Sequence, residues 1–183
     1  MSRAKKIKYI VIHTTAGFAS GMAVDNYFKR PFSQGGRGWR VGGYHRIVER
    51  NGAIFEAYDF SRITNGVAGF NDECIHISFV GGVNREKSKR GIYVAEDTRT
   101  FDQKVGIEKC IIEAIDWLKK NGKDITRDLM IIGHRDFSDD RNSDGIISSN
   151  ERIKECPCFD AIKEYNGLYG ATNSTQILPK NRK

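Results

Sequence analysis

Two histidines stand at the ends of short apolar segments of the sequence. His13 follows the run Tyr9-Ile-Val-Ile, and His134 follows Met130-Ile-Ile-Gly. Strands end in loops, and loops commonly carry functional sites. One such histidine is more often a hydrogen-bonded structural residue. A matched pair with a cysteine downstream favours a catalytic zinc set, in which two imidazoles and one thiolate or carboxylate leave a fourth position for water.

The other two histidines are weaker candidates for a metal site. His45 follows Tyr44 along a predicted strand and therefore points to the opposite face, where we expect it to be packed or solvated. His76 lies inside a predicted strand and shares a face with Cys74 and Ser78. We expect His76 in the core or beside a ligand, and not as a ligand itself.

The four cysteines divide into two kinds. Cys74 and Cys110 lie in apolar surroundings and are expected to be small buried residues. Cys156 and Cys158 are two positions apart, too close for an ordinary disulfide. Unpaired thiols are typical of a chain made in a reducing compartment.

An acidic segment near the carboxyl end matches the calcium-loop pattern D-x-[DN]-x-[DN]-G-x5-E at every specified position. The alternative is an Asp/Asn/Gly-rich turn that holds no ion. We expect the loop to bind calcium and to fix the start of the last helix, with Lys154 and Cys156 on it. Gly145 would allow the sharp turn. The predicted ligands are Asp140, Asn142, Asp144, Ile146 (through its carbonyl), Ser148 (through a water) and Glu151.

Composition limits the class of protein. The chain has 183 residues, of which 30 are Lys or Arg and 23 are Asp or Glu, so the net charge is +7. With 39% hydrophobic residues and only 4 Cys, it is neither a disordered chain nor a disulfide-built miniprotein. No apolar run reaches the roughly 18 residues of a membrane span. The basic start resembles no secretory signal, so we expect synthesis in the cytoplasm.

The positive charge would suit nucleic acid, an anionic membrane or a wall polymer. Basic residues are spread along the chain and do not alternate with aromatic residues as in a base-stacking platform, which disfavours nucleic acid. We expect neither nucleic acid nor a membrane as a partner.

Hydrophobic patterning predicts an α/β (α+β) fold, a single domain with a central mixed β-sheet flanked by helices. The clearest helix spans 101–121, with a stripe from Val105 through Ile112 to Leu118. Asn51-Gly52 predicts a hairpin turn. A last helix is expected within 151–165, and 166–183 reads as a polar tail. Strands are predicted at 9–13, 44–49, 53–58, 74–80 and 129–132, and a further helix at 23–28.

Five segments in order resemble the zinc-dependent N-acetylmuramoyl-L-alanine amidases, the group that includes T7-type phage lysozymes and peptidoglycan recognition proteins. The likeness runs from Tyr9 to Tyr165. The segments are Ile10-Val-Ile-His-Thr-Thr15, Gly43-Tyr-His-Arg-Ile-Val48, Ile75-His-Ile-Ser-Phe-Val-Gly-Gly82, Gly133-His-Arg-Asp-Phe137 and Lys154-Glu-Cys-Pro-Cys-Phe-Asp160.

The resemblance implies particular roles for five residues. His13, His134 and Cys156 match the family's zinc ligands. Tyr44 and Lys154 match the tyrosine and lysine that catalytic members keep. Non-catalytic recognition members typically lose the cysteine ligand, which this chain retains. The sequence departs from the family at Cys158, where small residues are usual.

The resemblance thus implies a zinc amidase domain at 1–165 with a peptidoglycan recognition protein-like fold. It would be a monomer that cleaves the bond between N-acetylmuramic acid and L-alanine with a zinc-activated water. It would act on the bacterial wall after release or export. Two alternatives stay open: a non-catalytic peptidoglycan-binding module, and a zinc amidase with a different substrate.

Overall fold

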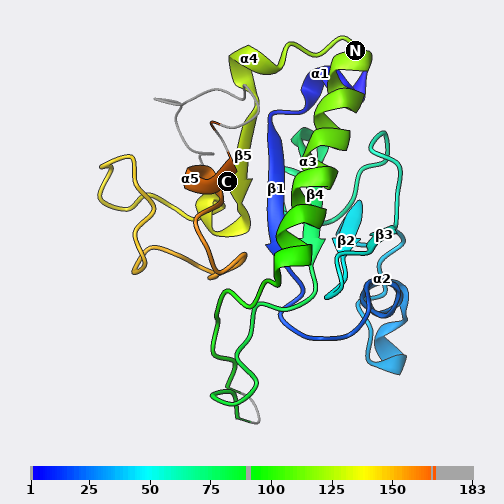
Figure 1. Cartoon of the computed structure of the whole chain (residues 1–183), viewed down its shortest axis with the longest axis vertical. Coiled ribbons are helices and arrows are strands. Elements are labelled where there is room, and N and C mark those ends of the chain that lie inside the picture. The colour runs from blue at the N-terminus through cyan, green and yellow to red at the C-terminus, as the bar shows by residue number, and fades with distance from the viewer. Residues whose placement is uncertain (1, 90–91, 166, 168–183) are drawn as a thin grey trace.

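The computed structural model describes residues 2–89, 92–165 and 167 and contains one central sheet (Figure 1). The five strands lie in the order β3-β2-β4-β1-β5. β1 pairs in parallel with β4 and β5, and β2 pairs in parallel with β4. β3 runs antiparallel to β2. The strands are β1 (Tyr9–Thr14), β2 (Arg46–Val48), β3 (Ile54–Glu56), β4 (Cys74–Phe79) and β5 (Met130–Gly133). This mixed sheet confirms the expected fold class.

Each predicted strand is present, although β2 and β3 are shorter than the pattern indicates. The Asn51-Gly52 turn joins them, and Gly52 takes a left-handed φ of 79°. The helix expected at 23–28 is α2 (Gly21–Lys29), whose first turn is capped by the Ser20 side chain. Short helical turns that lack a repeating apolar pattern were not anticipated. They are α1 (Arg3–Lys6), α4 (Ile125–Asp128), η1 (Phe32–Gln34), η2 (Asn71–Glu73) and η3 (His134–Phe137).

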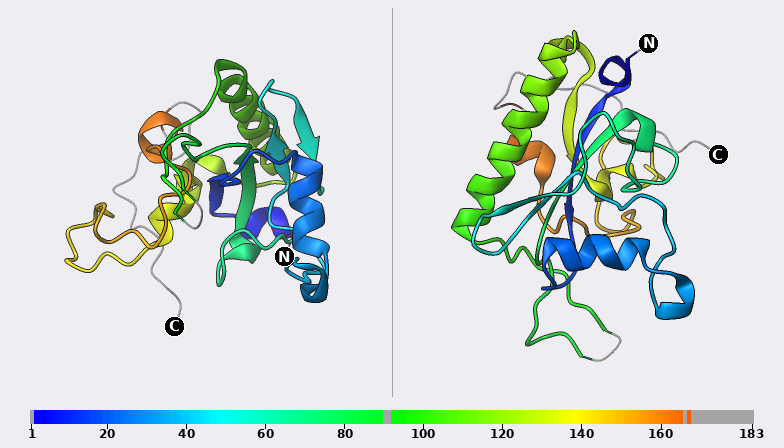
Figure 2. Two further views of the ribbon diagram at one scale, coloured as in Figure 1. Left: turned by 90° about the horizontal axis from the view of Figure 1, so that it is seen from below. Right: turned by 90° about the vertical axis from the view of Figure 1, so that its right-hand side faces the viewer.

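The long helix α3 (Phe101–Lys120) covers one face of the sheet, as Figures 1 and 2 show. Thr100 and Gln103 form a capping box at its start. The buried stripe of the helix includes Ile107, Ile111 and Leu118. Ile112, predicted in this stripe, is instead 45% exposed. The helix buries an arc narrower than the sequence pattern indicates.

Strand residues facing α3 alternate with residues facing the opposite side. Ile10 and Ile12 of β1 join the core beneath α3, together with Ile75, Ile77 and Phe79 of β4. Val11 of β1 and Cys74 of β4 belong to a second cluster on the other face. Because side chains alternate along a strand, His13 shares the face of Val11. The second face therefore combines a small apolar core with polar groups at its edge.

The last helix, α5 (Ala161–Tyr165), is short and packs beside β5. It begins after Lys154 and Cys156, which lie in the loop that leads to it. The expectation that these two residues stand on the last helix is therefore wrong. The predicted tail at 166–183 lies outside the described residues, apart from Gly167. Within the described ranges, no helix is long and apolar enough to cross a membrane.

A buried arginine ties two distant loops together near Cys156. The Arg99 guanidinium lies 3.2 Å from the centroid of the Phe159 ring. It also donates to the Asp97 and Glu164 carboxylates and to the Tyr165 hydroxyl. Its side chain is only 2% exposed. Arg99 thus links the end of the long loop after β4 to the segment that carries Cys156.

We expect Arg99→Ala to lower the free energy of unfolding by about 2 kcal/mol, because buried charge-assisted hydrogen bonds would be lost and Glu164 is partly solvated. The free energy of unfolding of Arg99→Lys should lie between those of Arg99→Ala and the unmodified chain, since lysine keeps the positive charge but lacks the planar guanidinium. Urea denaturation of the three proteins measures this. Equal stability of Arg99→Ala and the unmodified chain would contradict the assignment of Arg99 as a clamp.

Candidate metal centre and cleft

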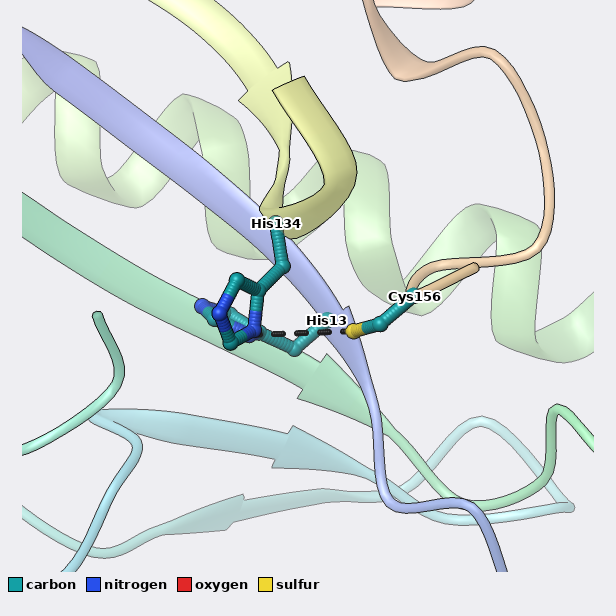
Figure 3. A group of neighbouring side chains, drawn as sticks. All are labelled: His13, His134 and Cys156. Atoms are coloured by element: carbon teal, nitrogen blue, oxygen red, sulfur yellow. Dashed lines mark hydrogen bonds between the residues drawn. The ribbon is translucent and has the colours of Figure 1, made fainter. Parts of the chain in front are cut away.

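Strand geometry places His13 at the centre of the site. β1 is the middle partner of β4 and β5, and His13 pairs in register with Ser78. The His13 side chain is fully buried on the sheet face that α3 does not cover. Figure 3 shows His134 and Cys156 reaching His13 from two other segments. The parallel ends of β1 and β5 bring the two histidines together.

The donor atoms of His13, His134 and Cys156 all lie within 4.8 Å of one another. His13 Nδ1 is 3.8 Å from Cys156 Sγ. Ligands of one tetrahedral zinc lie roughly 3.3–3.8 Å apart, given usual bond lengths of about 2.0–2.3 Å. Among the residues that the structure describes, this is the one group of three or more such side chains that converges. It could hold a zinc ion with a fourth position left open.

Backbone contacts fix the cysteine loop against the strand ends. The Arg135 amide, next to His134, donates to the Cys156 carbonyl at 2.7 Å. Pro157 packs so closely on Gly133 that a Cβ there would lie 2.5 Å from its ring. The Thr14 amide donates to Cys156 Sγ at 3.2 Å. Contacts with the backbone at the ends of β1 and β5 therefore hold the Cys156 loop beside the two histidines.

Burial sets the protonation of the three candidate ligands. It lowers the pKa of His13 well below its usual value, with a further contribution from neighbouring His134. Burial and then Lys154 lower the pKa of His134 to about 4. Both imidazoles are thus neutral at pH 7 and keep a lone pair for a metal. Burial raises the pKa of the Cys156 thiol to about 12, so a bound cation would have to displace its proton.

The other two histidines are buried behind His13. His76 Nδ1 lies 3.1 Å from His13 Nε2, so His76 is beside a candidate ligand, as the sequence analysis allowed. His45 is fully buried and packs in the interior. Its Nε2 lies 2.9 Å from the Arg62 carbonyl oxygen. Neither belongs to the converging group of donors.

Cys158 does not belong to the group of converging donors. Its thiol donates to the Gly82 carbonyl at 3.3 Å, on the loop that follows β4. Burial raises the pKa of this thiol to about 11. Cys158 takes a left-handed φ of 75°. Geometry therefore separates two cysteines that the sequence alone left in competition. Cys74 and Cys110 are fully buried, as predicted.

Two adjoining cavities meet beside the His13 group. The first, here the Arg40 arm, has a volume of about 650 Å³ and is lined by Arg40, Phe70, Phe137 and their neighbours. The second, the Tyr44 arm, has about 660 Å³ and is lined by Tyr27, Tyr44, Tyr93, Cys156 and others. Six of the described residues line both arms: Arg37, Trp39, Asn65, Gly66, His134 and Lys154.

Tyr44 and Lys154 both line this cleft. The Tyr44 ring lies 5.0 Å from the His13 ring, centroid to centroid. Burial raises the pKa of Tyr44 above its usual value, so it remains a phenol at neutral pH. Lys154 is exposed and lies where both arms meet, near His134. The structure thus brings all five resemblance-based site residues around one cleft.

Sequence reasoning missed most of the cleft lining. Arg37, Trp39 and Arg40 come from the turn-rich stretch after η1, and Asn65 comes from the loop before β4. These loops have no repeating pattern, so only their tertiary placement reveals a role. The Trp39 indole stacks on Phe28 of α2 at 5.0 Å between ring centroids. A Gly-Trp pair after a basic loop was the one available signal.

The sequence profile of the N-acetylmuramoyl-L-alanine amidases matches residues 3–157, which is most of the chain. The chain belongs to this family. The family places it among proteins that hydrolyse or bind peptidoglycan. All five side chains discussed above fall within the matched range.

One protein sequence and several solved structures are similar to this chain. An uncharacterized protein of Haemophilus influenzae is 31% identical over 110 residues, which span 60% of this chain and 83% of that protein. The amidase LysC of Clostridium intestinale has a TM-score of 0.58 at 17% identity, covering 93% of this chain and 89% of its own. Bumblebee PGRP-SA has a TM-score of 0.59 at 15% identity, covering 92% and 86%. These structures share the fold.

The predicted calcium loop closes on its own backbone. Glu151 accepts from the amides of Arg141 and Ser148, each at 2.9 Å. The Ser148 hydroxyl is the main cause that lowers the pKa of Glu151 to about 2. Asp140 accepts from the Gly145 amide. The loop's carboxylates do not converge as the His13 group does. Calcium binding stays a prediction, and the loop leads into a segment of turns and bends before α5, not directly into a helix.

We expect Cys156→Ser to lose metal or activity, because the sulfur beside His13 is removed. Cys158→Ser should keep both, because its thiol donates to the Gly82 carbonyl and does not belong to the converging group of donors. Metal content by elemental analysis, with the unmodified chain as reference, decides the matter. The reverse pattern would mean that Cys158 is the sulfur ligand.

If the acidic loop binds calcium, millimolar calcium should raise the melting temperature, since calcium at about 100 times its Kd adds about 2.7 kcal/mol to unfolding. Asp144→Ala should abolish the rise, and Asp116→Ala on α3 should not. Thermal melts with calcium or magnesium measure this. If calcium changes neither the melting temperature nor the activity, the loop is a turn that holds no ion.

Proposed function

We propose that this protein hydrolyses the amide bond between N-acetylmuramic acid and L-alanine, with a zinc ion held by His13, His134 and Cys156. The single observation that carries the proposal is the convergence of these donors at the junction of two cavities. Membership of the amidase family supports the same reaction. Zinc in a three-ligand site supplies a Lewis acid and an activated water at neutral pH.

The residues present fit such an ion. Neutral imidazoles and one sulfur are a donor set that zinc prefers. The Thr14 amide donates to Cys156 Sγ, which favours the thiolate that a metal needs. His13 and His134 are deprotonated at neutral pH because they are buried. No side chain would have to change its protonation at neutral pH except Cys156.

Lys154 would stabilise the charge that develops on the carbonyl oxygen. Attack on the amide carbon makes a tetrahedral oxyanion, which needs positive charge or hydrogen-bond donors close by. Lys154 lines the cleft beside His134, and after burial its ammonium is the second cause that lowers the pKa of that imidazole.

Tyr44 would orient the attacking water or pass a proton to the departing amine. Its raised pKa keeps the hydroxyl protonated, so it acts as a hydrogen-bond donor. The adjacent ring of His13 places it within the site. Phe28 packs edge-on against Tyr44 at 5.5 Å between centroids and limits its rotation.

The charge of the cleft supports a peptidoglycan substrate. The Arg40 arm is lined by Arg37, Arg40 and Lys154, and by no carboxylate among the described residues. Wall peptides carry free carboxylates that such an arm would attract. A Drosophila recognition protein of this fold is known in complex with tracheal cytotoxin. Two arms of similar volume would suit a substrate that has a sugar on one side of the cleaved bond and a peptide on the other.

Digestion of purified wall sacculi tests the function. The expected products are glycan strands and stem peptides with new L-alanine amino termini, identified by mass analysis. New reducing sugar ends without those termini would establish a glycosidase. Tight binding without cleavage would establish the non-catalytic alternative. If the protein leaves sacculi uncleaved but hydrolyses other amides, its substrate is a different one.

We expect Lys154→Ala to reduce turnover by about 10²–10³, the usual loss when one oxyanion stabiliser is removed. Zinc content should be unchanged, because Lys154 is not a ligand. Lys120→Ala, at the far end of α3, is the matched control and should retain full activity. Release of amino termini at saturating substrate measures turnover. A fully active Tyr44→Phe would remove Tyr44 from the mechanism and leave Lys154 unaffected.

A further inference from the structure

A second histidine lies directly behind the candidate ligand His13. His76 is fully buried in β4, two residues before Ser78, which is the register partner of His13 on the adjacent strand β1. His76 Nδ1 is 3.1 Å from His13 Nε2. On its other side, His76 Nε2 is buried without a hydrogen-bond partner among the residues that the structure describes. A buried polar atom without a partner is destabilising, so an interaction elsewhere on the same ring must account for this placement.

The backbone of His76 is fixed by His45. The Arg62 carbonyl oxygen can only accept, so the proton of His45 sits on Nε2, which faces that oxygen at 2.9 Å. His45 Nδ1 is therefore an acceptor, and it receives the His76 amide at 2.9 Å. The His45 amide donates in turn to the His76 carbonyl at 2.8 Å. These bonds fix the His76 backbone and leave both nitrogens of its ring available for other contacts.

Gly66 then limits the motion of that ring. A Cβ at Gly66 would lie 2.4 Å from His76 Nδ1, so the Gly66 backbone rests against the imidazole. Gly66 also lines both arms of the cleft. It thus separates the His76 ring from the cleft and keeps water away from the contact with His13.

The two facing nitrogens must share one proton. If His13 Nδ1 is to face Cys156 with a free lone pair, the proton of neutral His13 has to sit on Nε2. His13 Nε2 then donates to His76 Nδ1, and the His76 proton goes to Nε2, the buried atom that has no partner. In the opposite arrangement His13 Nδ1 is protonated and cannot bind a metal. The contact therefore couples the tautomer of His76 to the availability of His13.

We propose that His76 is a positioning residue that holds His13 with Nδ1 turned to the metal and Nε2 protonated. This inference rests on the proposed function, because it assigns the metal to the His13 group. Side chains that hold a metal-bound histidine by its second nitrogen typically contribute 10–100-fold to metal affinity. The group that accepts from the second nitrogen of a metal-bound histidine is usually a carboxylate or a carbonyl, and in this proposal it is the neutral imidazole of His76.

Zinc affinity, measured by competition with a chromogenic chelator, tests the proposal on the full chain. His76→Ala should weaken zinc binding by about 10–100-fold. His76→Asn should recover most of the affinity, because its Oδ1 can accept from His13 Nε2 near the position of Nδ1. Ile75→Ala is the matched control: it truncates a buried neighbour on the same strand that faces α3, and its zinc affinity should equal that of the unmodified chain.

Nitrogen NMR of the zinc-loaded, unmodified chain gives a reading that does not depend on how the variants fold. The proton should be found on Nε2 of both His13 and His76. Coordination of His13 through Nε2, or unchanged zinc affinity in His76→Ala, would overturn the role of His76 while leaving the amidase proposal intact. An unmodified chain that binds no zinc would instead overturn the proposed function and this inference with it.

Discussion

Side chains on a strand alternate between two faces, and the rest of this structure depends on how that alternation is used in β1 and β4. One set of residues, Ile10 and Ile12 with Ile75 and Ile77, is sealed beneath α3. The other set includes His13 and His76 and ends at the cleft. Because the period is two, a one-residue shift of either strand would turn the imidazole of that strand toward α3 and destroy the site. The register of β1 and β4 therefore determines both the packing of the core and the positions of the donors.

Sequence reasoning reached the fold and the candidate ligands because both have local signals. The apolar runs before His13 and His134 predict strands, and five ordered motifs supply the resemblance. It did not reach the contact between His13 and His76, because the pairing of β1 with β4 across more than 60 residues is not encoded in either segment. Short turns such as α1 and α4 lack a repeating pattern, and Ile112, predicted in the buried stripe of α3, is exposed.

The two sides of the candidate centre are supported differently. His13 lies on β1, an interior strand that pairs with β4 on one edge and with β5 on the other. Cys156 lies on a loop, and its support comes from single contacts: the Arg135 amide on its carbonyl, Pro157 against Gly133, and Arg99 stacked on Phe159. Loops held by few contacts open more readily than strands in a core. The cysteine side of the centre is therefore the side where local opening would first release a ligand.

The separation of Cys156 from His13 by 143 positions has a consequence for synthesis. A ribosome adds residues one by one, and domains acquire their structure as the chain emerges. While residues 1–134 are outside the ribosome, β1, β4 and β5 are present but no sulfur stands beside the histidines. The complete donor set first exists when the segment around Cys156 has emerged and docked. A nascent or prematurely ended chain therefore contains the sheet and the histidines without the means to complete the centre.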